Sequence, residues 1–218
     1  IHKTDLKDVW RELKGDERKF SYSLPVQKSF SRKDYTSVSK DWRSGCANVT
    51  LDPKTAHPNL ILSEDRKSVR HEFRWQDLPD NPERFDSQRY VLGHEGFRAG
   101  RHFWEVTVGS EGNWSVGVAR KSLRRKGFVE WRTEEGIWAL ERWGDGYRAS
   151  DLSIANCFPL SKTLRRIWMS LNYEVLRVAF YDAEAGSHLH TFSGASFSGE
   201  TLLPFFHVDG VEPLTISP

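Results

Sequence analysis

Alternating hydrophobic and polar positions over residues 100–120 give the clearest structural signal in the chain. From His102 to Val108 alternate residues are His, Trp, Val and Val, while Phe103, Glu105 and Thr107 lie between them. A period of two is typical of a strand with one buried face. Residues 113–120 repeat the pattern after a glycine-containing turn. We therefore predict an antiparallel hairpin whose tryptophans fill a sandwich core.

Short strand signals separated by turn residues continue along the chain from Cys46 onward. Asp52-Pro53 and His57-Pro58 indicate turns because proline interrupts strand pairing, and Gly144-Asp145-Gly146 indicates a hairpin turn. About a dozen such segments predict an all-β fold, a two-layer antiparallel β-sandwich. The other predicted strands are 48–51, 60–62, 68–75, 90–92, 136–143, 147–149, 165–171, 175–181, 188–192, 202–207 and 214–216.

The first 45 residues have a different pattern. Thr4 is a favourable helix N-cap, and apolar residues recur after it with helical spacing as far as Gly15: Leu6, Val9, Trp10 and Leu13. This predicts a short amphipathic helix that packs on the β domain, forms the tail of a preceding coiled coil, or forms a homodimer contact. Residues 16–45 carry scattered aromatic residues without a period, which indicates an extended linker. We therefore divide the chain into helix and linker, 1–45, and sandwich, 46–218.

Composition narrows the function classes. The 32 basic residues are nearly balanced by 30 acidic residues, which argues against a nucleic-acid surface. No apolar run approaches the roughly 20 residues needed to cross a bilayer, so we expect no membrane insertion by this chain. Cys46 and Cys157 are the only cysteines, and so few favour a reduced, cytoplasmic protein over a disulfide-rich secreted one.

Candidate catalytic and metal motifs are weak. His188 and His190 would share a strand face, but no further ligand lies at a suitable spacing. The glycines around Ser196 miss the nucleophile-elbow spacing by one residue. The turn at 144–146 lacks the Lys-Ser/Thr and the helix of a phosphate loop. We predict a non-enzymatic domain with no cofactor and no metal.

Several short motifs follow one another along the predicted sandwich. Residues 49–53 read Val-Thr-Leu-Asp-Pro, and Trp104-Glu105-Val106 and Leu171-Asn172-Tyr173-Glu174 follow, together with PRY-like sequence at 62–70 and 78–85. Asn172 and Thr107 depart from the Asp and Glu that are usual at these positions. The chain thus resembles the PRY-SPRY domains of butyrophilins and tripartite-motif (TRIM) ubiquitin ligases, with PRY at about 46–99 and SPRY at about 100–218.

This resemblance implies a cytosolic recognition module that takes part in immune signalling. In a TRIM protein it would select the target of a ubiquitin ligase whose catalytic RING is a separate domain. In a butyrophilin it would be the intracellular tail of a receptor. The expected partner is a protein. A small-ligand sensor in a butyrophilin tail is the alternative, and an enzyme is a third hypothesis.

The resemblance also implies which residues form the binding face, since loops on a rigid sandwich carry specificity. The candidate loops are 86–89, 121–135, 143–147 and 207–212. Trp143 corresponds to a contact tryptophan of antibody-binding TRIM relatives, and a nearby Arg148 would add a directional donor. The predicted partner-binding residues are Ser87, Gln88, Ser115, Glu130, Trp131, Trp143, Arg148 and His207.

The tryptophans are expected to differ in environment. Three are predicted to be core residues, namely Trp104, Trp114 and Trp138. Trp131 lies in a charged loop, which favours exposure, whereas Trp143 is evenly balanced between sheet packing and partner contact.

Butyrophilins that sense phosphorylated metabolites use a basic cluster on this same face. When the positions of that cluster are matched to this sequence by their flanking motifs, Arg148 is the only permanent cation among them. The other positions are Gln88, Ser115, Glu130, Ile154 and His207. One dependable cation opposed by Glu130 would hold a pyrophosphate poorly, so we predict no tight binding of such ligands.

Overall fold

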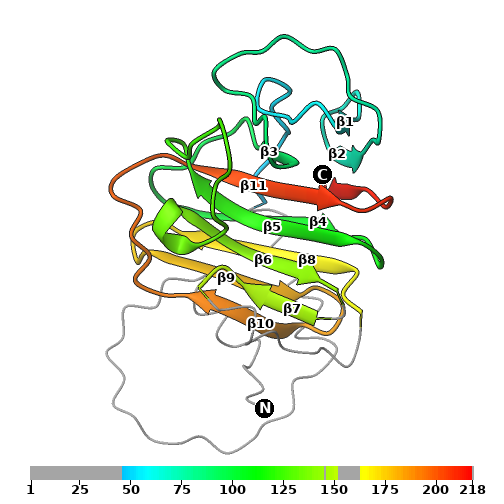
Figure 1. Ribbon diagram of the computed structural model, residues 1–218. Coiled ribbons are helices and arrows are strands. Elements are labelled where there is room, and N and C mark those ends of the chain that lie inside the picture. The colour runs from blue at the N-terminus through cyan, green and yellow to red at the C-terminus, as the bar shows by residue number, and fades with distance from the viewer. Residues whose placement is uncertain (1–45, 145, 152–162, 218) are drawn as a thin grey trace, which may run out of the picture.

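Two antiparallel sheets pack face to face in the computed structural model, which describes residues 46–144, 146–151 and 163–217 (Figure 1). The predicted helix and linker, with Ile154 and Cys157, lie outside the described residues. The larger sheet has the order β1-β2-β12-β4-β8-β9-β10. Its strands are β1 (Leu60–Leu62), β2 (Ser68–His71), β12 (Leu214–Ile216), β4 (Arg101–Thr107), β8 (Arg166–Asn172), β9 (Arg177–Asp182) and β10 (Ser187–Phe192).

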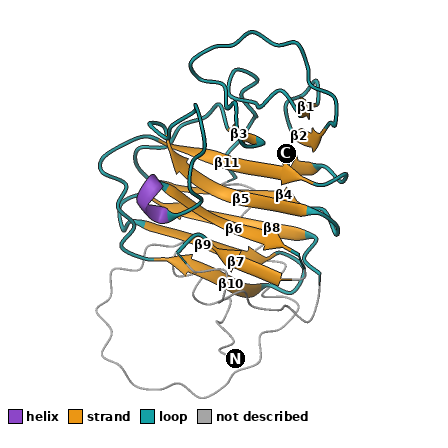
Figure 2. Cartoon of the chain, viewed as in Figure 1, coloured by secondary structure: helices purple, strands orange, loops and turns teal. Residues whose placement is uncertain are grey.

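The smaller sheet has the order β3-β11-β5-β6-β7. Its strands are β3 (Tyr90–Leu92), β11 (Leu202–Asp209), β5 (Asn113–Arg120), β6 (Ile137–Trp143) and β7 (Gly146–Ala149). One 3-10 turn, η1 (Thr133–Glu135), is the only helical element in the described ranges (Figure 2). The predicted all-β antiparallel sandwich is therefore confirmed.

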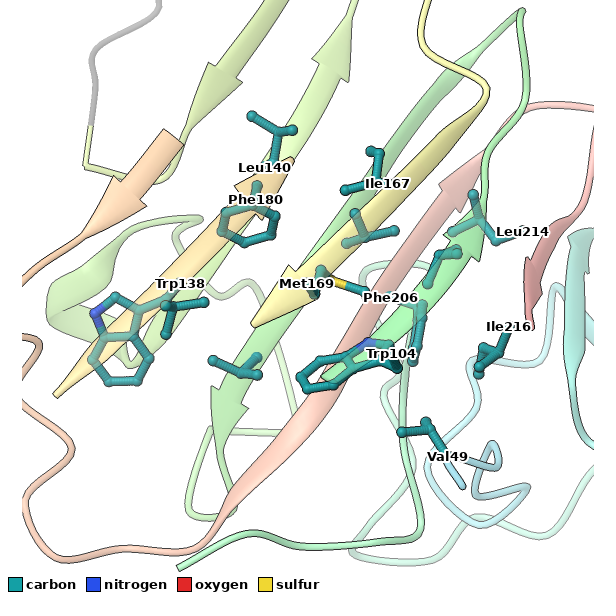
Figure 3. Close-up of a cluster of buried hydrophobic side chains, with 14 of the residues drawn as sticks. Val49, Trp104, Trp138, Leu140, Ile167, Met169, Phe180, Phe206, Leu214 and Ile216 are labelled. Atoms are coloured by element: carbon teal, nitrogen blue, oxygen red, sulfur yellow. The ribbon is translucent and has the colours of Figure 1, made fainter. Parts of the chain in front are cut away.

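The main core lies between the sheets, where alternate residues of facing strands meet (Figure 3). Trp104 of β4, with 1% of its surface exposed, and Trp138 of β6, with 2%, are both within this core. Trp114 of β5 is equally buried, so all three predicted core tryptophans are confirmed. Burial of such large side chains contributes roughly 2–3 kcal/mol each before the cost of ordering them.

The predicted hairpin between residues 100–109 and 113–120 is wrong. β4 pairs with β12 and β8, whereas β5 pairs with β11 and β6 in the other sheet. The chain crosses between the layers at 108–112, where Gly112 has a φ of +74° and lies against Gly210 so closely that a Cβ would come within 2.5 Å of its Cα. The two strands thereby contribute their tryptophans to the core from different sheets.

Several predicted strands also differ from the observed ones. Residues 48–51 form no strand, and Leu51 makes only an isolated bridge with Gly93. The strand predicted to reach residue 75 ends at His71, and beyond it the Glu72 backbone bonds to both the backbone and the side chain of Asn59. β9 begins at Arg177 since Leu176 adopts a positive φ of 54° in the preceding turn.

Candidate functional site

A row of polar side chains crosses the outer face of the smaller sheet, away from the main core. Strand register pairs successive members of the row, one from each strand, from β3 to β7. Alternate residues of a strand face opposite sides, so these positions point away from Trp114, Trp138 and their neighbours. We call these residues the polar row: Tyr90, His207, Ser115, Glu141 and Arg148.

Glu141 is the centre of the row. Its carboxylate accepts hydrogen bonds from Ser115 Oγ at 3.3 Å and from Arg148 Nε at short range. Nδ1 of His207 lies 3.9 Å from Oε1. Burial raises the pKa of Glu141, while Arg148 and Ser115 act to lower it. The buried carboxylate and guanidinium are thus mutually compensated, as buried charges in proteins require.

The guanidinium of Arg148 lies against two tryptophans. Its central carbon is 4.8 Å from the ring centroid of Trp131 and 5.3 Å from that of Trp143, within the range of cation–π attraction. Trp143 is 46% exposed. We call Trp131, Trp143 and Arg148 the Trp–Arg cluster.

The expected exposure of Trp131 is wrong, because its side chain is half-buried. Its indole packs against an apolar cluster on the outer face of the smaller sheet, and Arg148 covers its ring. Charged neighbours in the sequence therefore do not predict the environment of this tryptophan.

The other end of the row is aromatic and uncharged. The ring of His207 meets the ring of Tyr90 edge to face at a centroid distance of 5.4 Å. Burial lowers the pKa of His207 to about 4, so the imidazole is neutral at pH 7. Burial also raises the pKa of the Tyr90 phenol above its usual value. An ion pair between Arg89 and Asp209, at 2.8 Å, flanks this end.

Gln88 fixes the loop that carries Trp131. Its side-chain oxygen accepts a hydrogen bond from Val129 N at 3.1 Å, and its amide nitrogen donates to Val129 O at 2.5 Å. Val129 itself is buried in the apolar cluster beside Trp131. Gln88 therefore fixes the position of the loop that carries Trp131.

The structure brings five of the eight sequence-predicted site residues together in or beside the polar row: Ser115, Trp131, Trp143, Arg148 and His207. Ser87 is exposed on the neighbouring linker. Glu130 is exposed and pairs with Arg132 at 2.8 Å. Ser115 has no exposed surface, so a partner cannot reach it directly.

Sequence reasoning missed Glu141 and Tyr90. The signal for Glu141 was present, because Ile137, Ala139, Glu141 and Trp143 alternate with the core residues Trp138 and Leu140 along β6. A carboxylate among apolar residues on a strand face needs a partner nearby. Tyr90 carried no comparable signal.

The same outer face is apolar toward its other end. A second cluster of buried residues lies there beneath the 121–135 loop and the linker before β3. We call this region the covered half and the polar row with the Trp–Arg cluster the open half. Tyr90 of the polar row borders the covered half, which contains Phe85, Leu92, Ala119, Leu123, Val129, Ile137, Ala139, Leu203 and Phe205.

The described residues contain no group of three or more His, Cys, Asp or Glu side chains that could hold a metal ion. His188 bonds Thr191 at 2.6 Å and His190 bonds Asp151 at 3.2 Å, and the strand register shifts between the two histidines. No helix among the described residues is long and apolar enough to cross a membrane.

Two family models match the chain. The PRY model, described as the SPRY-associated domain, matches residues 49–97, and the SPRY domain model matches residues 101–216. Butyrophilin subfamily 1 member A1 of Bos taurus is 45% identical over 215 residues, which are 96% of this chain and 39% of the relative. Zinc finger protein RFP of Homo sapiens is 42% identical over 177 residues, 78% of this chain and 34% of the relative. The chain thus matches well under half of each relative.

Solved structures share the fold. The PSpry domain of TRIM65 superposes with a TM-score of 0.72 at 24% identity, covering 89% of this chain and 100% of that domain. Stonustoxin superposes with a TM-score of 0.65 at 26% identity, covering 81% of this chain and 30% of the toxin. The fold is therefore one that occurs in quite different proteins.

Proposed function

Because the chain belongs to the PRY-SPRY family found in butyrophilins and TRIM proteins, we propose that it recognises a protein partner through the open half of the smaller sheet's outer face. The observation that carries this proposal is the Trp–Arg cluster, in which Trp143 is 46% exposed beside a held guanidinium. Tryptophan and arginine are the residues most enriched among those that dominate binding energy in interfaces.

The eight predicted residues divide into two roles. Trp143, Arg148 and the accessible part of Trp131 contact the partner, with Ser87 and Glu130 at the rim. Gln88, Ser115 and His207 position these groups, together with Glu141. In the described part of the chain Arg148 bonds through Nε, and its terminal nitrogens have no acceptor there. These nitrogens can donate to a carbonyl or carboxylate of the partner.

The module is non-catalytic and works in the cytosol in immune signalling. Its parent is either a TRIM-type ubiquitin ligase, in which it selects the target, or a butyrophilin, in which it forms the intracellular tail. Both kinds of parent are represented among the relatives, since a butyrophilin and zinc finger protein RFP each match the chain at more than 40% identity.

A role as a sensor of phosphorylated small ligands is disfavoured by the charges of the row. Its one permanent cation, Arg148, is paired with Glu141, and His207 has its pKa lowered to about 4. A pyrophosphate would therefore meet a buried carboxylate and a neutral imidazole. We expect no tight binding, and a calorimetric titration with inorganic pyrophosphate that gave micromolar affinity would contradict this.

The experiment for the proposed function uses the purified chain to capture partners and then measures affinity with the purified partner. Trp143→Ala removes exposed ring area without opening the core, so we expect at least about a tenfold loss of affinity. Val175→Ser, at a residue 60% exposed in the β8–β9 turn, is the matched control and should bind as the natural chain does. Equal affinity for Trp143→Ala and the natural chain would refute the proposal.

A further inference from the structure

A second cluster of exposed aromatic side chains lies in the segment between β2 and β3, outside the polar row. Phe73 is 79% exposed and Trp75 is 63% exposed, with the exposed Arg74 between them in sequence. We call these three residues the aromatic patch. Large apolar side chains that are exposed together on a protein surface often mark an interaction site.

The backbone on both sides of the patch is anchored. Glu72 N donates to Asn59 O at 2.8 Å, and the Asn59 amide donates to Glu72 O at 2.9 Å. On the other side, the Gln76 amide donates to Pro58 O at 2.9 Å and to Leu60 O at 2.7 Å. The rings are therefore presented on a fixed frame, which reduces the entropy lost when a partner binds.

Each of the two aromatic rings makes an edge-to-face contact with a buried histidine. The Phe73 ring meets His71 at a centroid distance of 4.8 Å, and the Trp75 ring meets His57 at 5.4 Å. His57 and His71 are 4% and 9% exposed, and burial lowers the pKa of both imidazoles. The histidines thus provide uncharged support, and most of each aromatic ring remains available to a partner.

Among the basic residues in and around the patch, Arg74 is available to bind a partner. Arg70 pairs with Glu72 at 3.2 Å and Lys126 pairs with Asp80 at 2.5 Å. Arg74 has no ion pair or hydrogen bond from its side chain within the described residues. A carboxylate is the group that a free guanidinium binds with the most favourable geometry.

We propose that the aromatic patch is a second protein-binding surface that takes a linear segment of another protein in which a carboxylate lies beside aliphatic or aromatic side chains. The two rings supply apolar area, and the exposed Arg74 between them in sequence supplies a fork of donors. The patch offers one unpaired basic side chain rather than the cluster of basic residues that attracts an anionic membrane, so a membrane is disfavoured as the occupant. The proposal does not depend on the open half, since the two surfaces share no residue.

The test is selection of random dodecapeptides displayed on phage against the full purified chain, followed by fluorescence titration of synthetic copies. We expect recovered peptides that are rich in Asp or Glu next to Leu, Ile, Phe or Trp. Phe73→Ser and Trp75→Ser should each weaken these peptides by about tenfold or more. Arg74→Glu should abolish the preference for acidic residues, and Asp77→Asn should strengthen binding by removing a like charge.

Two controls separate this surface from the open half. Trp143→Ala should leave the affinity of the selected peptides unchanged, so the proposed function and this inference can fail independently. Val175→Ser should also bind normally. Circular dichroism checks that each variant is folded, and Arg74→Glu alters an exposed side chain, so it remains informative if an aromatic variant is unstable.

Three results would overturn the inference. Recovered peptides could bind equally well to the Phe73, Trp75 and Arg74 variants. Vesicles containing phosphatidylserine could bind the natural chain and lose binding in these variants, which would make a membrane the occupant. Sedimentation could show self-association that the same variants abolish, which would make a second copy of the chain the occupant.

Discussion

The two halves of the smaller sheet's outer face are built on the same strands but have opposite chemistry. Along β11 a step of two residues leads from Phe205 in the covered half to His207 in the polar row. On β6 the same step leads from Ala139 to Glu141. Since residues two apart in a strand share a face, the backbone is continuous and only the side chains change. If the open half binds the partner as proposed, stability and recognition are separated along single strands.

The two halves also differ in which interactions contribute to the stability of the fold. The covered half is stabilised by burial of apolar surface, which contributes roughly 25 cal/mol per Å² to the free energy of folding. The open half holds an ion pair whose desolvation offsets much of its attraction, so it adds little net stability. What the pair provides is a fixed position for Arg148 between two tryptophans.

The largest predicted effect is in the covered half. Phe205→Ala removes a ring with no exposed surface and leaves a cavity, so we expect the free energy of unfolding in urea to fall by about 3–5 kcal/mol. Trp143→Ala, in the open half, should change it by less than about 1 kcal/mol because the ring is half exposed. Similar losses for the two variants would remove the distinction between the halves.

Breaking the ion pair should give the next largest effect. Glu141→Ala leaves Arg148 largely buried without its counter-charge, and we expect a loss of about 3 kcal/mol in the free energy of unfolding. The double variant Glu141→Gln with Arg148→Met removes both charges and should recover most of that stability. A double variant as unstable as Glu141→Ala would show that the pair itself stabilises the fold.

The pH dependence tests the neutral end of the row. The pKa of His207 falls from 6.5 to about 4 on folding, so the unfolded chain binds its proton more readily. The resulting stability is present above pH 6.5 and is lost as the pH falls toward 4, by about 2 kcal/mol between pH 7.5 and pH 5. Denaturation of His207→Gln should show a correspondingly weaker dependence over this window. Identical pH profiles for the natural chain and His207→Gln would show that the His207 imidazole is solvated in the folded state.

The smallest effect concerns the loop carrying Trp131. Gln88→Ala removes two hydrogen bonds to Val129, and we expect about 1 kcal/mol of destabilisation. Amide exchange at Glu130 and Trp131 should rise while exchange in β5 stays unchanged. Ser87→Ala, at an exposed neighbour, is the matched control and should affect neither region. Unchanged exchange in the loop would show that other contacts hold it.

Alternation along the chain was sufficient to predict the sandwich and its tryptophan core. It failed for the β4–β5 hairpin, because alternation identifies a strand with one buried face but does not say which sheet the strand joins. A short connection can close a hairpin or cross between layers, and the close approach of Gly112 to Gly210 that allows the crossing joins residues far apart in sequence.

The candidate site could be predicted only in part, for a related reason. The Trp–Arg cluster followed from family motifs and loop positions. Glu141 was missed because its role depends on cross-strand register with Ser115 and Arg148, which sequence spacing does not reveal. The environment of Trp131 was mistaken because Arg148 and the covered half, rather than adjacent charged residues, determine its burial.

Calorimetric titration of one purified partner into the natural chain and into Trp143→Ala, with urea denaturation of both, tests the central claim most directly. We expect affinity to fall at least about tenfold while the free energy of unfolding changes by less than about 1 kcal/mol. Unchanged affinity, or a loss of affinity that merely follows a loss of stability, would contradict the assignment of recognition to the open half.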